Sequence, residues 1–188
     1  QRQMCIRDSN IFVESFKKKL HFNFPSNYFR WDLIQYLISK NKYSDYLEIG
    51  CDQDQLFSKI RINNKKGVDP VSGGNIRKTS DDFFEVNDEM FDIIFIDGLH
   101  EYSQVKKDIE NSLNFLNEDG IILLHDCLPN NYYDQAVPRC QWTWNGDVWK
   151  SIVSCRTKPD IDTYTLIADR GIGVIFSRKN KNQLDFDP

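Results

Sequence analysis

The sequence contains no apolar run long enough to cross a membrane, no C-x-x-C pair and no excess of basic charge. Because neither such a run nor the apolar core of a signal peptide is present, we expect a cytoplasmic protein. The five cysteines are odd in number and scattered, which argues against a disulfide framework and against a zinc site. The net charge is -4, so neither nucleic acid nor an anionic membrane is expected as a partner.

Glycine is also scarce where a dinucleotide site would need it. The apolar stretch Tyr46–Ile49 ends in Gly50, and no G-x-G-x-x-G pattern follows. Asp52 and Asp54 come next, and acids at this place would repel a phosphate. They suit a ligand that carries an ammonium or another positive charge. The sequence therefore argues against a nucleotide-dependent oxidoreductase.

The chain has 188 residues, enough for one domain with a sizeable core. Residues 1–9 show no periodicity and are interpreted as an appended, artefactual segment. Residues 10–178 are predicted to form the single domain, and residues 179–188 a polar tail.

Strand and helix patterns alternate along this domain. We expect helices at residues 10–20, 26–40 (capped by Ser26), 53–62, 101–116 and from Asn145 or Asp147 to residue 156. A further helix, capped by Ser80 or Thr79, is expected to contain Asp81–Phe84. Short apolar runs predict parallel strands at 46–49, 66–69, 91–96 and 121–124, with a further short strand at 76–79. Residues 163–168 and 171–176 are predicted to form a hairpin, so the last strand is antiparallel. The predicted architecture is doubly wound α/β.

Acids occur at or near the carboxyl ends of the predicted parallel strands, the edge at which ligands bind in open α/β sheets. They are Glu48, Asp69, Asp97 and Asp126. Asp69 follows Glu48 by about twenty residues, the spacing at which an acid reaches ribose hydroxyls in nucleotide-type folds. Glu48 has two interpretations: a solvent-facing or ion-paired strand residue, or an acid that faces a positively charged ligand.

A loop over residues 130–145 is rich in tryptophan and tyrosine. Loops of this length are commonly functional, and aromatic rings stack on sugars and on planar molecules. The more common roles of such residues are a packed cover or a dimer surface, so a carbohydrate acceptor and a homo-oligomer both stay open. We expect Asp147 to cap its helix and Trp149 to belong to the core.

The segments YLEIGC, GVDP, TSDDFF, FDIIFIDGLHEY, DGIILLHD and NGDVWK occur in this order between residues 26 and 177. In this series the chain resembles the class I S-adenosylmethionine-dependent methyltransferases, and more narrowly it is similar to methyltransferase family 24. The resemblance implies a Rossmann-like, mostly parallel, seven-stranded sheet with an antiparallel last strand. It also implies methyl transfer from S-adenosylmethionine to a small-molecule or sugar hydroxyl.

By this resemblance, the loops after the first strands bind the cofactor. Thr79, Ser80 and Asp81 would lie near the adenine amine, although Ser80 and Asp81 fit a helix cap equally well. Asp69 would contact the ribose hydroxyls. The full implied set is Glu48, Gly50, Cys51, Asp69, Thr79, Ser80, Asp81, Asp97 and Gly98.

The resemblance further implies a reaction centre. In catechol-type and magnesium-dependent sugar methyltransferases, the acids that match Asp97 and Asp126 hold Mg²⁺, which orients a substrate hydroxyl and lowers its pKa. His100 takes the place of the catalytic base, beside Asp97. Those enzymes have a third ligand where this chain has Cys127, a poor magnesium ligand, so Asp97 could instead contact the cofactor without a metal. His125 is expected to be a structural, hydrogen-bonded imidazole.

The expected activity is that of an S-adenosylmethionine-dependent O-methyltransferase, with Mg²⁺ as a candidate second cofactor. The alternative is a non-catalytic module that binds S-adenosylmethionine or a protein partner. N-methylation also stays open, because the sequence does not identify the acceptor.

Overall fold

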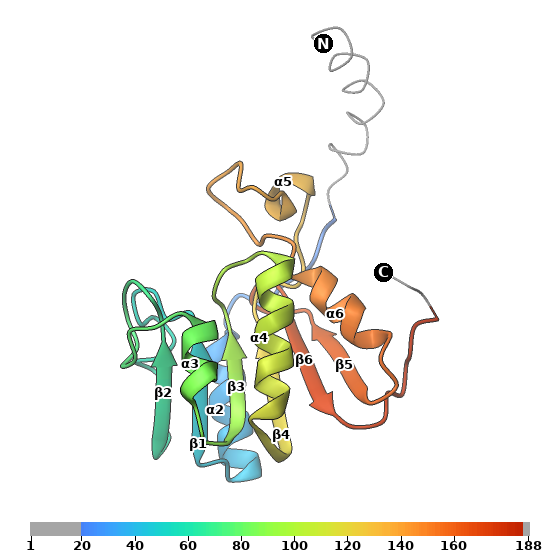
Figure 1. Cartoon of the computed structure of the whole chain (residues 1–188). Helices are drawn as coiled ribbons and strands as arrows, with labels where there is room; N and C mark the ends of the chain where they lie inside the picture. Colours follow the sequence, from blue (N-terminus) through green and yellow to red (C-terminus); the bar gives the residue numbers. More distant parts are fainter. Residues whose placement is uncertain (1–19, 186–188) are drawn as a thin grey trace, which may run out of the picture.

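The structure, a computed structural model, describes residues 20–185 as a sheet flanked by helices on both faces (Figure 1). The described part of the sheet has six strands: β1 (Asp45–Ile49), β2 (Asn64–Val68), β3 (Phe91–Ile96), β4 (Leu116–Leu124), β5 (Ile161–Leu166) and β6 (Ile172–Ser177). The helix predicted at 10–20 falls almost entirely outside the described residues.

The strand order is β2-β1-β3-β4-β6-β5. Strands β1 to β4 pair in parallel, whereas β6 is antiparallel to both β4 and β5. The predicted mostly parallel sheet with an antiparallel last strand is therefore confirmed. The predicted number of strands differs, because the segment at 76–79 makes only one bridge, from Ile76 to Val68, and adds no strand to the described sheet.

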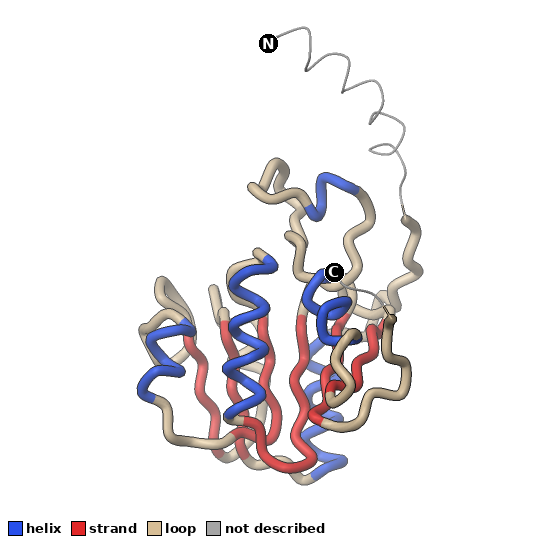
Figure 2. Tube along the Cα trace, turned by 45° about the vertical axis from the view of Figure 1, so that its right-hand side comes forward, coloured by secondary structure: helices blue, strands red, loops and turns tan. Residues whose placement is uncertain are grey.

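The helices divide between the two faces of the sheet. The bounds are α2 (Arg30–Asn41), α3 (Ser80–Val86), α4 (Tyr102–Asn114), the short α5 (Tyr132–Gln135) and α6 (Trp149–Arg156). Figure 1 shows α2 on one face of the sheet and α3, α4 and α6 on the other, and Figure 2 shows the same layers in a view turned by 45°. Within residues 20–185, every helix is too short or too polar to span a bilayer.

Two hydrophobic cores lie against the sheet because side chains alternate along each buried strand. In β3, Ile93 and Phe95 pack with α2, whereas Ile94 and Ile96 pack with the helices of the opposite face. All four side chains are at most 2% exposed. A strand covered on both faces reads as a continuous apolar run, which explains the sequence of β3.

The predicted helix at 53–62 is wrong: residues 53–59 form consecutive turns and residues 60–62 are irregular. Asp52 and Asp54 adopt positive φ angles of 46° and 59°, a conformation that a right-handed helix excludes. The helix predicted from Ser26 begins later, at Arg30, where the side chain of Asp32 accepts the backbone N–H of Phe29 at 3.0 Å. The N-cap position is therefore occupied by Phe29 rather than Ser26, and Asp32 secures the start of the helix from its first turn.

Candidate functional site

A cavity of about 1100 Å³ opens at the carboxyl ends of the parallel strands. The loops after β1, β2 and β3 form its walls, and residues from the loop over 130–145 and from the β5–β6 turn complete it. Figure 1 shows α5 and its loop beyond these strand ends. Parallel sheets place their ligands at this edge, so the cavity occupies the position expected from the sequence.

Gly50 lets the chain turn sharply at the end of β1. Its φ is +85°, and a Cβ atom there would lie 2.3 Å from the backbone oxygen of Asp97. Any side chain would therefore push apart the ends of β1 and β3. Gly50 and Gly98 both line the cavity, as their predicted cofactor contacts require.

Asp69 holds together the two loops beside the cavity. Its Oδ2 accepts the backbone N–H groups of Cys51 and Asp52, each at 3.1 Å, and its Oδ1 accepts those of Val71 and Ser72. Burial raises the pKa of Asp69, but these four hydrogen bonds outweigh burial and lower it. Asp69 lines the cavity as predicted, and it also has a structural role that the sequence did not reveal.

Two predicted cofactor contacts are absent from the cavity wall. Glu48 is 1% exposed, and its Oε2 accepts a hydrogen bond from the hydroxyl of Tyr46 at 2.5 Å. Burial raises the pKa of Glu48 to about 8, so this carboxyl carries a proton at neutral pH. Cys51 is 5% exposed and its thiol packs against Gly67 and Gly74. Neither side chain lines the cavity, and the contacts of Glu48 and Cys51 with the cofactor stay predictions.

The predicted adenine-contacting residues lie together at the start of α3. Thr79 caps this helix by accepting the backbone N–H of Asp82 at 3.1 Å, and Thr79, Ser80 and Asp81 all line the cavity. The amide of Gln104, on α4, donates to Ser80 and to Asp81 at 3.2 and 2.9 Å. Thr79, rather than Ser80 or Asp81, is therefore the helix cap, and all three residues line the cavity.

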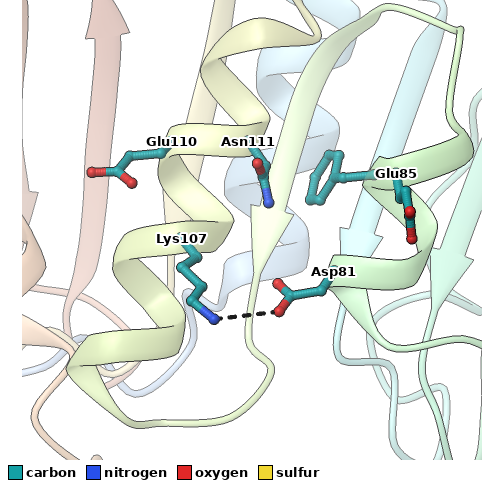
Figure 3. Close-up of a pocket in the computed structure, with 6 residues that line it drawn as sticks. Asp81, Glu85, Lys107, Glu110 and Asn111 are labelled. Atoms are coloured by element: carbon teal, nitrogen blue, oxygen red, sulfur yellow. Dashed lines mark hydrogen bonds and ion pairs between the residues drawn. The ribbon is translucent and has the colours of Figure 1, made fainter.

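Asp81 also faces a second, shallower groove between α3 and α4 (Figure 3). There its Oδ2 lies 3.4 Å from the Nζ of Lys107. The pair is exposed, and exposed pairs contribute only about 0–1 kcal/mol to stability. Asp81 therefore connects the two helices at the rim of the main cavity.

Asp97, His100 and Asp126 come together at the ends of β3 and β4. One ligand atom from each lies within 4.8 Å of the others. His100 Nε2 and His125 Nδ1 both lie 3.2 Å from Asp97 Oδ1, and His100 Nδ1 lies 3.3 Å from Asp126 Oδ2. The structure thus brings the residues predicted for chemistry into one cluster.

The charges in this cluster are strongly coupled. Burial raises the pKa of Asp97, but the charge of His125 and the hydrogen bonds from both histidines outweigh burial and hold that pKa well below its usual range. Burial lowers the pKa of His100 and of His125, and the neighbouring carboxylates reverse this effect for both. The pKa of His125 is raised well above its ordinary value by the carboxylates of Asp97, Asp126 and Asp169.

His125 is also held from its other side. Its Nε2 lies 3.6 Å from Asp169 Oδ1 and 3.4 Å from Arg30 Nη1. Arg30 and Asp169 form an ion pair at 3.1 Å. The imidazole of His125 is therefore fixed by β3, α2 and the β5–β6 turn, in agreement with its predicted structural role.

The donor set of the cluster fits a divalent cation. Two carboxylates and an imidazole converge, and among the described residues the buried Nδ1 of His100 has no hydrogen-bond partner of good geometry. Carboxylate oxygens suit Mg²⁺ or Mn²⁺, and imidazole suits several divalent metals. Cys127 takes no part: its Sγ contacts the backbone oxygens of Leu124 and His125.

The aromatic loop reaches the cluster through Trp144, whose ring stacks on His100 with centroids 5.5 Å apart and planes 20° apart. The indole N–H of Trp144 donates to the backbone oxygen of Ala136 at 2.6 Å. Asp147 does not cap α6. Its Oδ1 instead accepts the backbone N–H of Tyr102, the first residue of α4, at 2.6 Å. Trp149 is half-buried and its indole N–H donates to Gln135.

Sequence reasoning missed several cavity residues, of which Asp108, Arg139 and Arg170 are charged types. Asp108 is 1% exposed, on the α4 face that also carries Val105 and Ile109. An acid on the apolar face of a helix was the available signal. For the two arginines no local signal existed, because only the folded loops bring them to the cavity.

The comparisons with known proteins agree with this geometry. The profile of a family described as a methyltransferase domain, methyltransferase family 24, matches residues 37–127. That range contains all four strand-end acids. The chain has the class I methyltransferase fold and is similar to methyltransferase family 24. No curated protein matches it.

Solved methyltransferase structures share the fold at low sequence identity. An S-adenosylhomocysteine-bound methyltransferase from Podospora anserina, PaMTH1, is 17% identical with a TM-score of 0.56, over 80% of this chain and 78% of that chain. An O-methyltransferase from Bacillus cereus, in complex with S-adenosylhomocysteine, is 11% identical with a TM-score of 0.56, over 90% and 88%. The N-methyltransferase NodS from Bradyrhizobium japonicum is 16% identical with a TM-score of 0.51, over 79% and 93%.

Because both O- and N-methyltransferases occur among these structures, the fold alone does not decide which atom is methylated.

Proposed function

We propose that this protein transfers a methyl group from S-adenosylmethionine to a hydroxyl oxygen of a small molecule. The observation that carries the proposal is the composition of the cavity. The predicted adenine-contacting residues at the start of α3 and the cluster of Asp97, His100 and Asp126 line the same space of about 1100 Å³. The binding of S-adenosylhomocysteine by structural neighbours supports the choice of cofactor.

The cavity residues would divide the work between binding and chemistry. Acids along the wall suit the ammonium and the sulfonium of the cofactor, because opposite charges attract across a partly desolvated space. His100 is placed to accept the proton of the acceptor hydroxyl, with Asp97 orienting its ring through Nε2. Methyl transfer then proceeds by in-line displacement, to which the protein contributes mainly alignment.

Asp97 and Asp126 are the residues that would hold a divalent cation. Such an ion, when bound, would lower the pKa of the acceptor hydroxyl and orient it. His125 Nδ1 lies 3.2 Å from Asp97 Oδ1 and 3.5 Å from Asp126 Oδ2, so a bound cation would share both carboxylates with this imidazole.

Calorimetric titration with S-adenosylhomocysteine tests the cofactor assignment directly. We expect micromolar binding to the wild-type protein and loss of binding in Gly98→Leu. Gly98 lines the cavity, and a Cβ there meets only Ile49 in ordinary contact, so a larger side chain fills space without straining the backbone. Gly98→Ala is the matched control and should keep most of the affinity.

Lack of binding to the wild-type protein would overturn the proposed function. Binding without methylation of hydroxylated acceptors would favour a non-catalytic cofactor-binding module instead.

A further inference from the structure

The cavity has two ends of different chemistry. Acids line the walls built by the strand ends and α3, whereas the guanidinium groups of Arg139 and Arg170 come from the loop over 130–145 and from the β5–β6 turn. These two arginines are the only Lys or Arg side chains among the described residues that line the cavity. Binding of the cationic methyl donor would explain the acids of the cavity but not the two arginines at its other end.

Arg170 is already engaged within the protein. Its Nε lies 3.5 Å from Asp126 Oδ1, and its Nη2 donates to Asn145 Oδ1 at 3.4 Å. Since Asn145 also donates to Asp126 Oδ1, at 3.0 Å, Arg170 belongs to the support of that acid. The positive charge of Arg170 is therefore already paired with Asp126 and is not free to bind a ligand.

Arg139 is different, because within the described part of the chain no carboxylate pairs with it. Its Nε and Nη2 donate to the backbone oxygens of Gln141 and Trp142, and these contacts shape the loop. Backbone carbonyls leave the positive charge of the guanidinium uncompensated, and five N–H donors exceed the two that are used. Arg139 therefore presents charge and free donors at the mouth of the cavity.

Indole rings surround this guanidinium. Its carbon lies 5.5 Å from the ring centroid of Trp142 and 5.8 Å from that of Trp144. The Trp142 side chain is 92% exposed, an unusual place for so large an apolar surface. A ring-bearing ligand bound at Arg139 would cover part of this indole by stacking.

The distance from Arg139 to the reaction centre is short. Trp144 contacts both, since its ring lies 5.5 Å from that of His100 and 5.8 Å from the Arg139 guanidinium. The two groups are thus separated by no more than the sum of these spacings. A single small molecule is therefore long enough to contact both the imidazole of His100 and the guanidinium of Arg139.

We propose that Arg139, with Trp142 and Trp144, forms an acceptor subsite for an anionic group, and that the acceptor is a small hydroxylated ring compound carrying a carboxylate or a phosphate. This inference rests on the proposed function and specifies its acceptor. The guanidinium binds the anion through paired N–H donors, and the reacting hydroxyl lies at His100. Asp97 and Asp126 would repel the anion at the reaction centre, which orients the acceptor with its hydroxyl inward.

The test is calorimetric titration of the protein saturated with S-adenosylhomocysteine, using two matched pairs of probes. The carboxylate pair is 3,4-dihydroxybenzoate and catechol; the phosphate pair is glucose 6-phosphate and glucose. We compare wild type, Arg139→Gln, Arg139→Lys and the control Arg61→Gln, which removes an exposed arginine outside the cavity.

We expect at least one anionic probe to bind the wild type and Arg61→Gln about tenfold more tightly than its neutral partner, as a charge-assisted hydrogen bond predicts. Arg139→Gln should abolish this preference, Arg139→Lys, which keeps the charge but not the paired donors, should retain part of it, and all four proteins should bind S-adenosylhomocysteine equally. Arg139→Lys separates loss of charge from damage to the loop. The pair that shows the preference identifies carboxylate or phosphate.

Normal S-adenosylhomocysteine binding without any preference for an anion, or a preference that survives in Arg139→Gln, overturns the acceptor subsite alone. Failure of the wild type to bind S-adenosylhomocysteine overturns the proposed function and the subsite together.

Discussion

Single side chains in this protein combine structural and chemical roles in ways that residue type alone does not reveal. Glu48 and Asp69 are both acids near strand ends, yet one is protonated within the core and the other accepts four backbone hydrogen bonds. The pKa of Glu48 is raised by burial, whereas that of Asp69 is lowered by its hydrogen bonds despite burial. The surroundings of each carboxyl group, rather than its residue type, therefore determine its pKa and its role.

Glu48 gives a prediction for stability against pH. Its pKa in the folded state is about 8, above its ordinary value of 4.5, so folding stabilises the protonated form. This contribution is complete below pH 4.5 and is lost as the pH rises through 8. Glu48→Gln cannot ionise and should lose less stability than wild type between these limits. Urea denaturation at pH 5 and pH 8.5 measures the difference, and parallel losses in both proteins would contradict the prediction.

Asp126 gives a prediction for metal binding. Its side chain is 2% exposed, and its φ of 60° is one that asparagine adopts readily. Asp126→Asn should therefore fold but bind Mn²⁺ at least about tenfold more weakly. Losses of this size are typical even when only a residue that supports a metal ligand is changed. Electron paramagnetic resonance of free Mn²⁺ measures the affinity, and Asp160→Asn, at an exposed position, is the control. Equal Mn²⁺ binding by Asp126→Asn would remove this residue as a ligand.

Side-chain hydrogen bonds hold the loop over 130–145 together, whereas regular backbone hydrogen bonds hold the helices and strands. The loop over 130–145 folds around Asp134, which is 3% exposed. The carboxylate of Asp134 accepts hydrogen bonds from Asn130, Asn131 and Gln141, and its backbone oxygen accepts those of Asn145 and Gly146. One side chain thereby positions the segment that brings Arg139 and Trp144 to the cavity.

Asp134→Ala should loosen this loop without unfolding the sheet. The three part-buried donors from Asn130, Asn131 and Gln141 lose their carboxylate partner, at no more than about 1–3 kcal/mol for each such group. We expect faster proteolysis within residues 130–145 and unchanged S-adenosylhomocysteine affinity, measured by limited trypsin digestion and calorimetry. Asp88→Ala, at an exposed loop position, is the control. Unchanged cleavage in Asp134→Ala would show that the loop does not depend on this carboxylate.

The protein as a whole is a sheet between two apolar cores, and the strands in the middle belong to both. Ile122 of β4 is fully buried, whereas Ile167 in the β5–β6 connection is 55% exposed. Ile122→Ala should lower the free energy of unfolding by about 2–5 kcal/mol through lost burial and a cavity. Ile167→Ala should change it by less than about 0.5 kcal/mol. Guanidinium denaturation compares them, and similar losses would contradict a core centred on β4.

Local patterns in the sequence determined the apolar strands, the helices α3 and α4, the terminal hairpin and the positions of the strand-end acids. Strands buried on both faces need continuous apolar runs, and parallel strands bring their carboxyl ends to one edge, so Asp97, His100 and Asp126 could be placed together in advance. The segment 53–62 was mistaken for a helix because the amphipathic pattern of Leu56, Phe57 and Ile60 also suits a packed loop.

Only the tertiary structure decided which side chains face the cavity. The burial of Glu48, the hydrogen bonds from Cys51 and Asp52 to Asp69 and the stacking of Trp144 on His100 depend on contacts between separate segments of the chain. Such contacts leave no periodic trace in the sequence. Hydrophobic burial determines the fold through many similar residues, whereas the site depends on a few long-range contacts, each specific to one pair of groups.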